Sequence, residues 1–307
     1  MSKVAVVQAG SVIFDTEAST EKALKYIAEV AANGAQHVVF PEAFLGGYPK
    51  GSAYGAAIGV RTEVGREEYL RYVNSAVSID GPEVRRLIEA SAEHGISMVM
   101  GVIEKLGNTL YCTALLIHPQ DGLVGFHRKL MPTGTERLIW GFGDGSTLDV
   151  MDTEVGRVGS VICWENYMPL MRQAMYAKGT EIYCVPTADD RDTWQSTMQH
   201  IALEGRVFVL SACQYIHRDS FPPEHQVDFE PAFGDDFMRG GSVIIDPTGK
   251  VLAGPVFGEE TVLYADIDLD VKSKSHLDFD SVGHYARPDV FTLTVNTQAA
   301  NSVSFTA

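Results

Sequence analysis

Residues 157–169, RVGSVICWENYMP, contain the cysteine that is best placed for chemistry in this chain. An apolar run that includes Val158 and Val161 predicts a strand with Cys163 at its end, and Pro169 then opens a helical pattern. A strand-to-helix turn projects a side chain out of the sheet, near backbone N–H groups and the positive end of a helix. Because such surroundings lower the pKa of a thiol from about 8.5 toward neutrality, Cys163 is predicted to be a thiolate nucleophile.

Two other predicted strands end in residues that could assist a thiol. Residues 36–42 (QHVVFPE) place Glu42 just past a strand, and residues 123–129 (LVGFHRK) do the same for Lys129. Taken singly, Glu42 and Lys129 would be solvated strand ends, and a lone cysteine is usually a small buried apolar residue. Residues beyond the carboxyl ends of strands in an α/β protein meet in one crevice. We therefore expect a general base, an oxyanion stabiliser and a nucleophile to meet there.

Alternating helix and strand patterns along the chain position these three residues. A helix at 17–33 is closed by Gly34, and a helix at 82–94 is stopped by Gly95. Further helices are expected at 169–178 and 193–204. The expected strands are 3–9, 36–42, 96–103, 110–117, 123–127, the run up to Cys163, 181–185, 207–213, 242–245, 251–253 and 261–267.

The second half of the chain repeats the β-α-β-α-β-β order of the first half, which indicates two sheets. Each sheet needs helices on its outer side and an apolar partner on its inner side. Two sheets packed face to face between helices satisfy both needs, so we predict an α/β fold with four α-β-β-α layers. Residues 51–76 and 217–241 fall outside the pattern, and loops of that length are usually functional, interfacial or disordered.

Composition restricts the class of protein. With 307 residues and 45% hydrophobic content, the chain can bury a sizeable core. The net charge of −16 argues against nucleic acid or an anionic membrane surface as a partner. No stretch approaches the roughly 20 apolar residues of a membrane helix, and the short apolar run after Lys3 does not indicate a signal peptide.

Cysteine and histidine spacing gives two further expectations. The four cysteines show no CxxC spacing, which predicts a reducing compartment and a cytoplasmic protein. Besides Cys163 they are Cys112, Cys184 and Cys213, which lie in apolar runs and are expected to be inert core residues. The histidines show no HExxH or similar spacing, so we expect neither a metal nor a nucleotide cofactor.

Four long stretches carry the motifs of one enzyme family, in the order in which that family has them. They are 41–51 (PEAFLGGYPKG), 127–146 (HRKLMPTGTERLIWGFGDGS), 163–172 (CWENYMPLMR) and 194–214 (WQSTMQHIALEGRVFVLSACQ). Through them the chain resembles the nitrilase superfamily, and within it the true nitrilases of plant and plant-like bacterial type, over essentially its whole length. The resemblance implies the same four-layer sandwich as one domain at 1–273, followed by a C-terminal extension at 274–307. Residues 217–238 match no pattern of the family.

The resemblance also implies which residues form the site. The Glu–Lys–Cys triad of the family falls on Glu42, Lys129 and Cys163, and its second glutamate falls on Glu136. From the residues alone, Glu136 would be a surface carboxylate in a loop. The resemblance makes it a group that shuttles protons or orients Lys129. Glu165, next to the nucleophile, belongs either to the site or to the framework.

Four aromatic residues near the triad in sequence or on a later helix are candidates for an apolar wall around the organic group of a substrate. They are Tyr48, Tyr54, Trp164 and Trp194. Most aromatic residues in such a chain belong to the core. His127, just before Arg128 and Lys129, is expected to be a packing residue.

The resemblance implies a nitrilase that converts an organic nitrile to a carboxylic acid and ammonia through a cysteine thioimidate and an acyl-enzyme. Arylacetonitriles, aliphatic dinitriles and cyano-amino acids all remain open as substrates. One alternative is an amidase or carbamoylase with the same triad, which the motifs at 163–170 and especially at 127–137 and 194–205 disfavour. The other is a catalytically silent binding or scaffold relative, which the intact triad disfavours.

The segment after about Lys274 predicts association between subunits. It continues past the last expected strand with Phe279, Tyr285 and Phe291, which a solvated tail would lack. The family resemblance implies dimers that extend into larger spirals. We expect at least a homodimer and possible spiral filaments, with 51–76 and 217–241 as extension surfaces and the C-terminal segment crossing between subunits.

Overall fold

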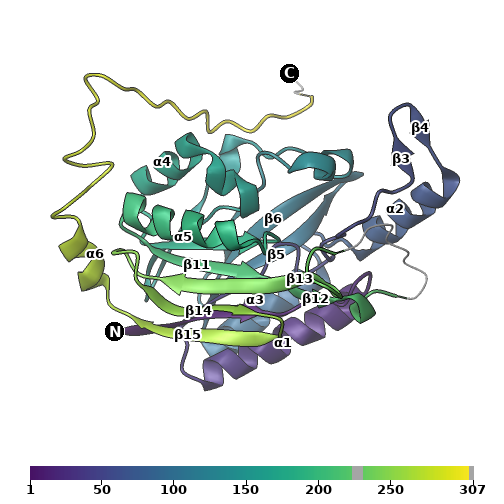
Figure 1. Ribbon diagram of the computed structural model, residues 1–307, viewed down its shortest axis with the longest axis horizontal. Coiled ribbons are helices and arrows are strands. Elements are labelled where there is room, and N and C mark those ends of the chain that lie inside the picture. Colours follow the sequence, from purple (N-terminus) through teal and green to yellow (C-terminus); the bar gives the residue numbers. More distant parts are fainter. Residues whose placement is uncertain (223–230, 304–307) are drawn as a thin grey trace.

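Two β-sheets pack against each other between two layers of helices in the computed structural model, which describes residues 1–222 and 231–303 (Figure 1). The first sheet has the strand order β15-β1-β2-β5-β6-β7, and the second has the order β12-β13-β11-β10-β9-β8 with β14 paired to β13. Helices α1 (Thr16–Ala32) and α3 (Pro82–His94) cover the first sheet, and α4 (Pro169–Ala177) and α5 (Asp192–Gly205) cover the second. The predicted α-β-β-α sandwich is confirmed.

Each predicted strand has a counterpart in the two sheets, although not every boundary agrees. The strands of the first sheet are β1 (Ser2–Gln8), β2 (His37–Val39), β5 (Ser97–Leu106), β6 (Thr109–His118), β7 (Gly122–Arg128) and β15 (Thr261–Ile267). Those of the second are β8 (Val150–Thr153), β9 (Gly156–Ser160), β10 (Ile182–Thr187), β11 (Phe208–Cys213), β12 (Tyr215–His217), β13 (Asp236–Ile245) and β14 (Val251–Phe257). Among these, β8 and β12 have no counterpart in the sequence prediction.

The last strand of the chain, β15, joins its two halves. β15, from the end of the second half, pairs antiparallel with β1 of the first sheet, with Ser2 opposite Ile267. The apolar layer between the sheets draws on both halves, for example Val6 and Val39 from one and Ile182 and Leu210 from the other. Parallel strands such as β10 and β11 are buried on both faces, which explains their continuous apolar sequence.

The prediction of a loop at residues 51–76 is wrong for most of this stretch. It holds a small hairpin, β3 (Ala56–Ala57) and β4 (Val60–Arg61), and the helix α2 (Glu63–Ser75), which together project from the sandwich (Figure 1). The Thr62 hydroxyl caps α2 by accepting a hydrogen bond from Gly65 N at 3.1 Å. Few residues of α2 are buried, so its sequence lacks the apolar stripe by which the other helices were predicted.

The described part of residues 217–241 also contains regular structure, although a long loop was predicted there. β12 pairs with β13, which begins at Asp236, and a short turn η4 (Arg218–Ser220) follows β12. Residues 223–230, which that prediction included, lie outside the described residues.

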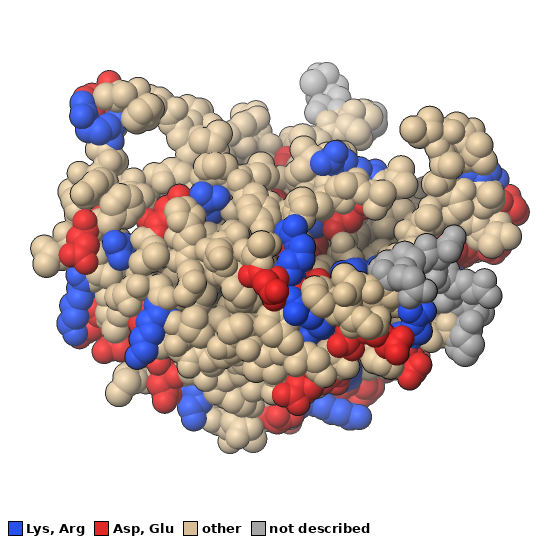
Figure 2. Space-filling view, viewed as in Figure 1, with Lys and Arg blue, Asp and Glu red and all other residues tan. Residues whose placement is uncertain are grey.

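The surface and the helices carry two further observations. On the face shown in Figure 2, basic side chains lie scattered among acidic ones, and its described residues form no broad basic stripe of the kind that follows a phosphate backbone. Within residues 1–222 and 231–303, no helix is both long enough and apolar enough to cross a membrane.

Candidate active site

Cys163 lies at the turn between a strand of the second sheet and helix α4, as predicted. The strand β9 ends at Ser160, earlier than expected, and Cys163 is the first residue of the short 3₁₀ turn η3 (Cys163–Tyr167). Cys163 has a φ of 49°, in the left-handed region that non-glycine residues rarely adopt. The Asn166 amide holds this conformation by donating to Cys163 O at 2.8 Å and to Val161 O at 3.0 Å. Such strain is a frequent feature of functional sites.

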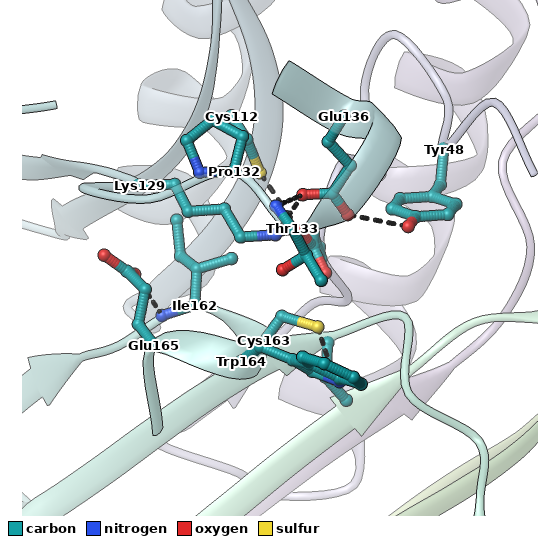
Figure 3. Close-up of polar contacts among 12 residues, drawn as sticks. Tyr48, Cys112, Lys129, Pro132, Thr133, Glu136, Ile162, Cys163, Trp164 and Glu165 are labelled. Carbon is teal, nitrogen blue, oxygen red and sulfur yellow. Dashed lines mark hydrogen bonds and ion pairs between the residues drawn. The ribbon is translucent and has the colours of Figure 1, made fainter. Parts of the chain in front are cut away.

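Glu42, Lys129 and Glu136 come from three segments and meet beside Cys163. Glu42 follows β2, Lys129 follows β7, and Glu136 lies in the 3₁₀ turn η1 (Gly134–Leu138). Lys129 Nζ donates to Glu42 Oε1 at 2.7 Å and to Glu136 Oε2 at 2.8 Å (Figure 3). The structure therefore brings together all four residues, and Glu136 is buried rather than on the surface.

The two carboxylate oxygens of Glu42 have different surroundings. Oε1 accepts the hydrogen bond from Lys129 and a second one from the thiol of Cys112, whose Sγ lies 3.4 Å away. Oε2 is buried and has no hydrogen-bond partner among the described residues. One oxygen is thus held in place while the other remains able to accept a proton.

The pKa of the Cys163 thiol corrects one prediction. Burial and the negative charge of Glu42 raise this pKa, and together they outweigh Lys129, which lowers it. The resting nucleophile is therefore a thiol rather than the predicted thiolate, because the turn geometry is a weaker influence than desolvation and the nearby carboxylate. Attack on a substrate requires a base that removes the thiol proton.

Burial and neighbouring charges also set the pKa values of Glu42 and Lys129. Burial raises the pKa of Glu42, and the opposing effects of Lys129 and the Cys163 thiol do not cancel it. Burial lowers the pKa of Lys129, but the negative charges around it, with Glu42 first, outweigh burial and raise this pKa well above its usual value. Lys129 is therefore a charged ammonium, and Glu42 is a stronger base than an exposed glutamate.

Thr187 is a neighbour of the nucleophile that the sequence reading missed. Thr187 is the last residue of β10, and its hydroxyl donates to Cys163 Sγ at a distance of 3.3 Å. The same oxygen accepts a hydrogen bond from Asp189 N at 3.0 Å, which orients the hydroxyl. Its position at the carboxyl end of a parallel strand is the signal that could have identified it.

Glu165 belongs to the framework rather than to the reacting groups. Its carboxylate accepts a hydrogen bond from Ile162 N at 3.0 Å (Figure 3) and another from Leu130 N at 2.6 Å. It also contacts His127 Nε2 at 2.9 Å. Glu165 thus joins the backbone next to Cys163 to the backbone next to Lys129. His127 is a packing residue, as predicted, and it is also hydrogen-bonded. Burial lowers the pKa of His127, but the effect of Glu165 outweighs burial and raises this pKa.

A cavity of about 190 Å³ opens at Cys163 and contains two of the four predicted aromatic residues. Tyr48 and Trp164 line it, and the Tyr48 hydroxyl donates to Glu136 Oε1 at 2.7 Å. Tyr54 lines an adjoining cavity of about 240 Å³, which shares Tyr48 and Glu136 with the first. The organic group of a small substrate could extend from one cavity into the other.

Trp194 does not belong to this wall, which corrects the fourth aromatic assignment. It is fully buried between α5 and the second sheet, where its indole donates to Ser211 Oγ at 3.2 Å. Its ring faces Tyr167, whose own ring faces Trp164, so an intervening aromatic residue separates it from the cavity. The helical periodicity of α5 directs position 194 into the core.

Charged side chains also line the cavity, which the sequence did not reveal. Lys50 Nζ lies 3.8 Å from Asp190 Oδ1, and both residues line the cavity. Asp189 accepts a hydrogen bond from the Trp164 indole at 2.8 Å and pairs with Arg191. In the described part of the chain, no group of three or more His, Cys, Asp or Glu residues is arranged to hold a metal ion.

Comparison with known proteins supports a single family. The carbon–nitrogen hydrolase family matches residues 3–274. An aliphatic nitrilase of Sinorhizobium fredii is 56% identical over 98% of this chain and 97% of its own length. A bifunctional nitrilase/nitrile hydratase of Nicotiana tabacum is 53% identical over 99% of this chain and 89% of its own. Among solved structures, the C. elegans NitFhit protein superimposes with a TM-score of 0.74 at 19% identity, covering 98% of this chain and 68% of that one.

Proposed function

The chain belongs to the carbon–nitrogen hydrolase family, and on that premise we propose that Cys163, Glu42 and Lys129 are the catalytic residues of a nitrile-hydrolysing enzyme. The protein hydrolyses nitriles, because its near-full-length relatives from bacteria and plants are nitrilases by name. One observation supports this assignment best: the Lys129 ammonium forms ion pairs with two carboxylates beside the buried Cys163.

The first half of the reaction forms a bond to sulfur. Glu42 Oε2 removes the proton of the Cys163 thiol while Sγ attacks the nitrile carbon, and the nitrile nitrogen takes a proton from Lys129, which gives a thioimidate. Glu42 then passes the thiol proton to Lys129, its hydrogen-bonded neighbour, and is again a carboxylate. Lys129 and the backbone N–H of Trp164 stabilise the negative charge that develops on the nitrogen. Coupling proton removal to attack overcomes the raised pKa of the thiol.

The second half releases the products. Water activated by Glu42 adds to the thioimidate carbon, ammonia leaves, and a thioester on Cys163 remains. A second water, activated in the same way, cleaves the C–S bond and returns the proton to sulfur. One nitrile and two waters become one carboxylic acid and one ammonia, and no redox partner is consumed.

Glu136 acts in this scheme by holding the ammonium of Lys129. Its Oε2 accepts hydrogen bonds from Lys129 Nζ and from Thr133 N at 2.6 Å, and its Oε1 accepts one from Tyr48. A carboxylate with these three donors has little freedom to rotate. We therefore assign Glu136 the orientation of Lys129 and, through Lys129, the relay of protons toward the departing nitrogen.

The organic group of the nitrile lies, in this proposal, between Tyr48 and Trp164 and extends toward Tyr54. Support comes from the cavity at Cys163, which Tyr48 and Trp164 line, and from the adjoining cavity lined by Tyr54. Aromatic walls with a few polar groups are typical of small-molecule sites. Trp194 is not included.

Release of ammonia, amide and acid from a panel of matched nitriles and amides tests the proposed function. We expect ammonia and the carboxylic acid from at least one nitrile, with slower or no turnover of the corresponding amide. Faster turnover of the amides would favour an amidase or carbamoylase, and silence on the whole panel would favour a binding or scaffold protein.

We also propose that the enzyme is at least a homodimer and can extend into a spiral filament, with residues 51–76 and 217–241 as extension surfaces and residues 274–307 crossing between subunits. Leu277 and Phe291 of the C-terminal segment are 86% and 77% exposed, and Ile58 at the β3–β4 hairpin is fully exposed. The segment runs along the outside of the sandwich and returns to it where Ala300 N donates to Asp144 at 2.7 Å (Figure 1). Apolar side chains displayed in this way are typical of interfaces.

Truncation after His276 is expected to reduce the assembly. The cut leaves α6 (Leu269–Ser275) and both sheets intact, so the core should keep its melting temperature while light scattering reports a smaller particle. The double variant Leu277→Ser/Phe291→Ser in the full chain provides the matched test of the apolar contacts. A monodisperse, fully active monomer from the unaltered chain would contradict the proposal.

The cellular compartment that fits the cysteines is the cytoplasm, which we propose as the location. All four cysteines are free, and Cys163 must stay reduced to act as a nucleophile.

A further inference from the structure

Cys112 is a second thiol inside the site and was expected to be an inert core residue. It lies on β6, is almost completely buried, and places Sγ 3.4 Å from Glu42 Oε1. Its backbone oxygen also accepts a hydrogen bond from Lys129 N at 2.8 Å. Cys112 therefore contacts the carboxylate of the proposed base through its thiol and the backbone of Lys129 through its carbonyl oxygen. Cys184 differs from it, because its thiol faces the neutral imidazole of His37 at 3.5 Å.

The contact of Cys112 explains why the two oxygens of Glu42 are unequal. A carboxylate held by one donor can rotate about its terminal bond and exchange its oxygens, since that torsion is broad. Two donors on the same oxygen, from Lys129 and from Cys112, oppose this rotation. Oε2, the oxygen without a hydrogen-bond partner among the described residues, is then kept for the proton of Cys163.

We propose that Cys112 is a positioning residue of the nitrile-hydrolysing site, whose thiol donates to Glu42 Oε1 and keeps Oε2 available to the nucleophile. This role rests on the proposed function, because it acts through Glu42. Cys112 forms no bond to the substrate.

The chemistry of sulfur suits this position. Burial and the charge of Glu42 raise the pKa of Cys112 well above its usual value, so the thiol stays protonated and remains a donor. Cys163 lines the cavity and Cys112 is not among its lining residues, so Cys112 does not compete for the substrate. Because S–H is a weak donor, it restrains the carboxylate while withdrawing little of its basicity, whereas a hydroxyl would withdraw more.

The pH dependence of activity reports on this hydrogen bond. The groups that face Glu42 are Lys129, Glu136, Cys163 and Tyr48, in addition to Cys112. A donor to an ionised carboxylate stabilises the charged form and lowers its pKa. Removal of the donor should raise the pKa of Glu42, so the acid limb of kcat/KM moves to higher pH.

A series at position 112 separates hydrogen bonding from packing. Cys112→Val fills the site without a donor, Cys112→Ala empties it, and Cys112→Ser retains a donor. We expect kcat on a nitrile to fall by about tenfold to a hundredfold in the valine and alanine variants, with KM within about twofold. The serine variant should keep most of the activity, with an acid limb at or below that of the unaltered enzyme.

The same substitutions at Cys184 are the matched control, because that cysteine is equally buried but faces no carboxylate. They should change the thermal unfolding temperature without moving the acid limb. A valine variant at 112 with unchanged kcat and unchanged acid limb would overturn the role of Cys112. So would a serine variant as impaired as the valine variant, with the same pH profile. Absence of nitrile turnover by the unaltered enzyme would instead refute the proposed function itself.

Discussion

Replacing Cys163 with alanine should abolish nitrile turnover and leave the fold intact. The thiol is the group proposed to form the covalent bond to the substrate, and no reaction by this route can proceed without it. Its side chain is small, and the turn that carries it is held by Asn166 and Glu165 through contacts that the substitution does not remove. We expect activity below detection in an ammonia assay, with a thermal unfolding temperature within a few degrees of the unaltered protein.

The Cys163→Ser variant sharpens this test. Serine keeps the shape, but its hydroxyl is a much weaker acid than a thiol, so a carboxylate such as Glu42 should not generate a useful nucleophile. We expect it to be nearly as inactive as the alanine variant. Mass spectrometry during turnover should find an acyl or imidate adduct on the peptide that contains Cys163. An adduct on Cys112, Cys184 or Cys213, with Cys163 unmodified, would contradict the assignment.

Loss of the base or of the ammonium should have the next largest effect. Glu42→Gln removes the proton acceptor of Cys163, and Lys129→Ala removes the charge that stabilises the developing anion. Each should lower kcat by at least about a hundredfold, the scale associated with a general base or an oxyanion donor. Lys25→Ala, which removes an exposed lysine of α1, is the control for an unspecific effect of lost charge.

The pH profile of kcat/KM and a substitution of Glu136 test the same assignment. Burial raises the pKa of Glu42, so in the unaltered enzyme kcat/KM should fall, as pH is lowered, at a higher pH than an ordinary glutamate would produce. That acid limb should disappear in Glu42→Gln. Glu136→Gln retains one acceptor oxygen, replaces the other with an amide NH2 group and loses the charge paired with Lys129, so it should also be strongly impaired. Near-normal activity of Glu136→Gln would remove it from the site.

The sequence alone was enough to predict the layers of the fold and the three residues that we propose as the catalytic triad. Helix α3 follows from its amphipathic period together with Pro82 at its start and Gly95, whose φ is 64°, at its end. These are local signals, carried by neighbouring residues. Glu42, Lys129 and Cys163 could be selected because each follows an apolar strand run, and parallel strands bring their carboxyl ends to a common edge.

Tertiary structure alone decided how these residues behave. The burial of Glu136 against Lys129, the thiol of Cys112 on Glu42 and the position of Trp194 away from the cavity all depend on segments that are remote in sequence. The pKa of Cys163 illustrates the reason. Local geometry predicted a lowered value, whereas the sum of desolvation and the charge of Glu42, set by the packing of two sheets, raises it. A pattern along the chain names the groups, but their charge and orientation follow from what surrounds them in space.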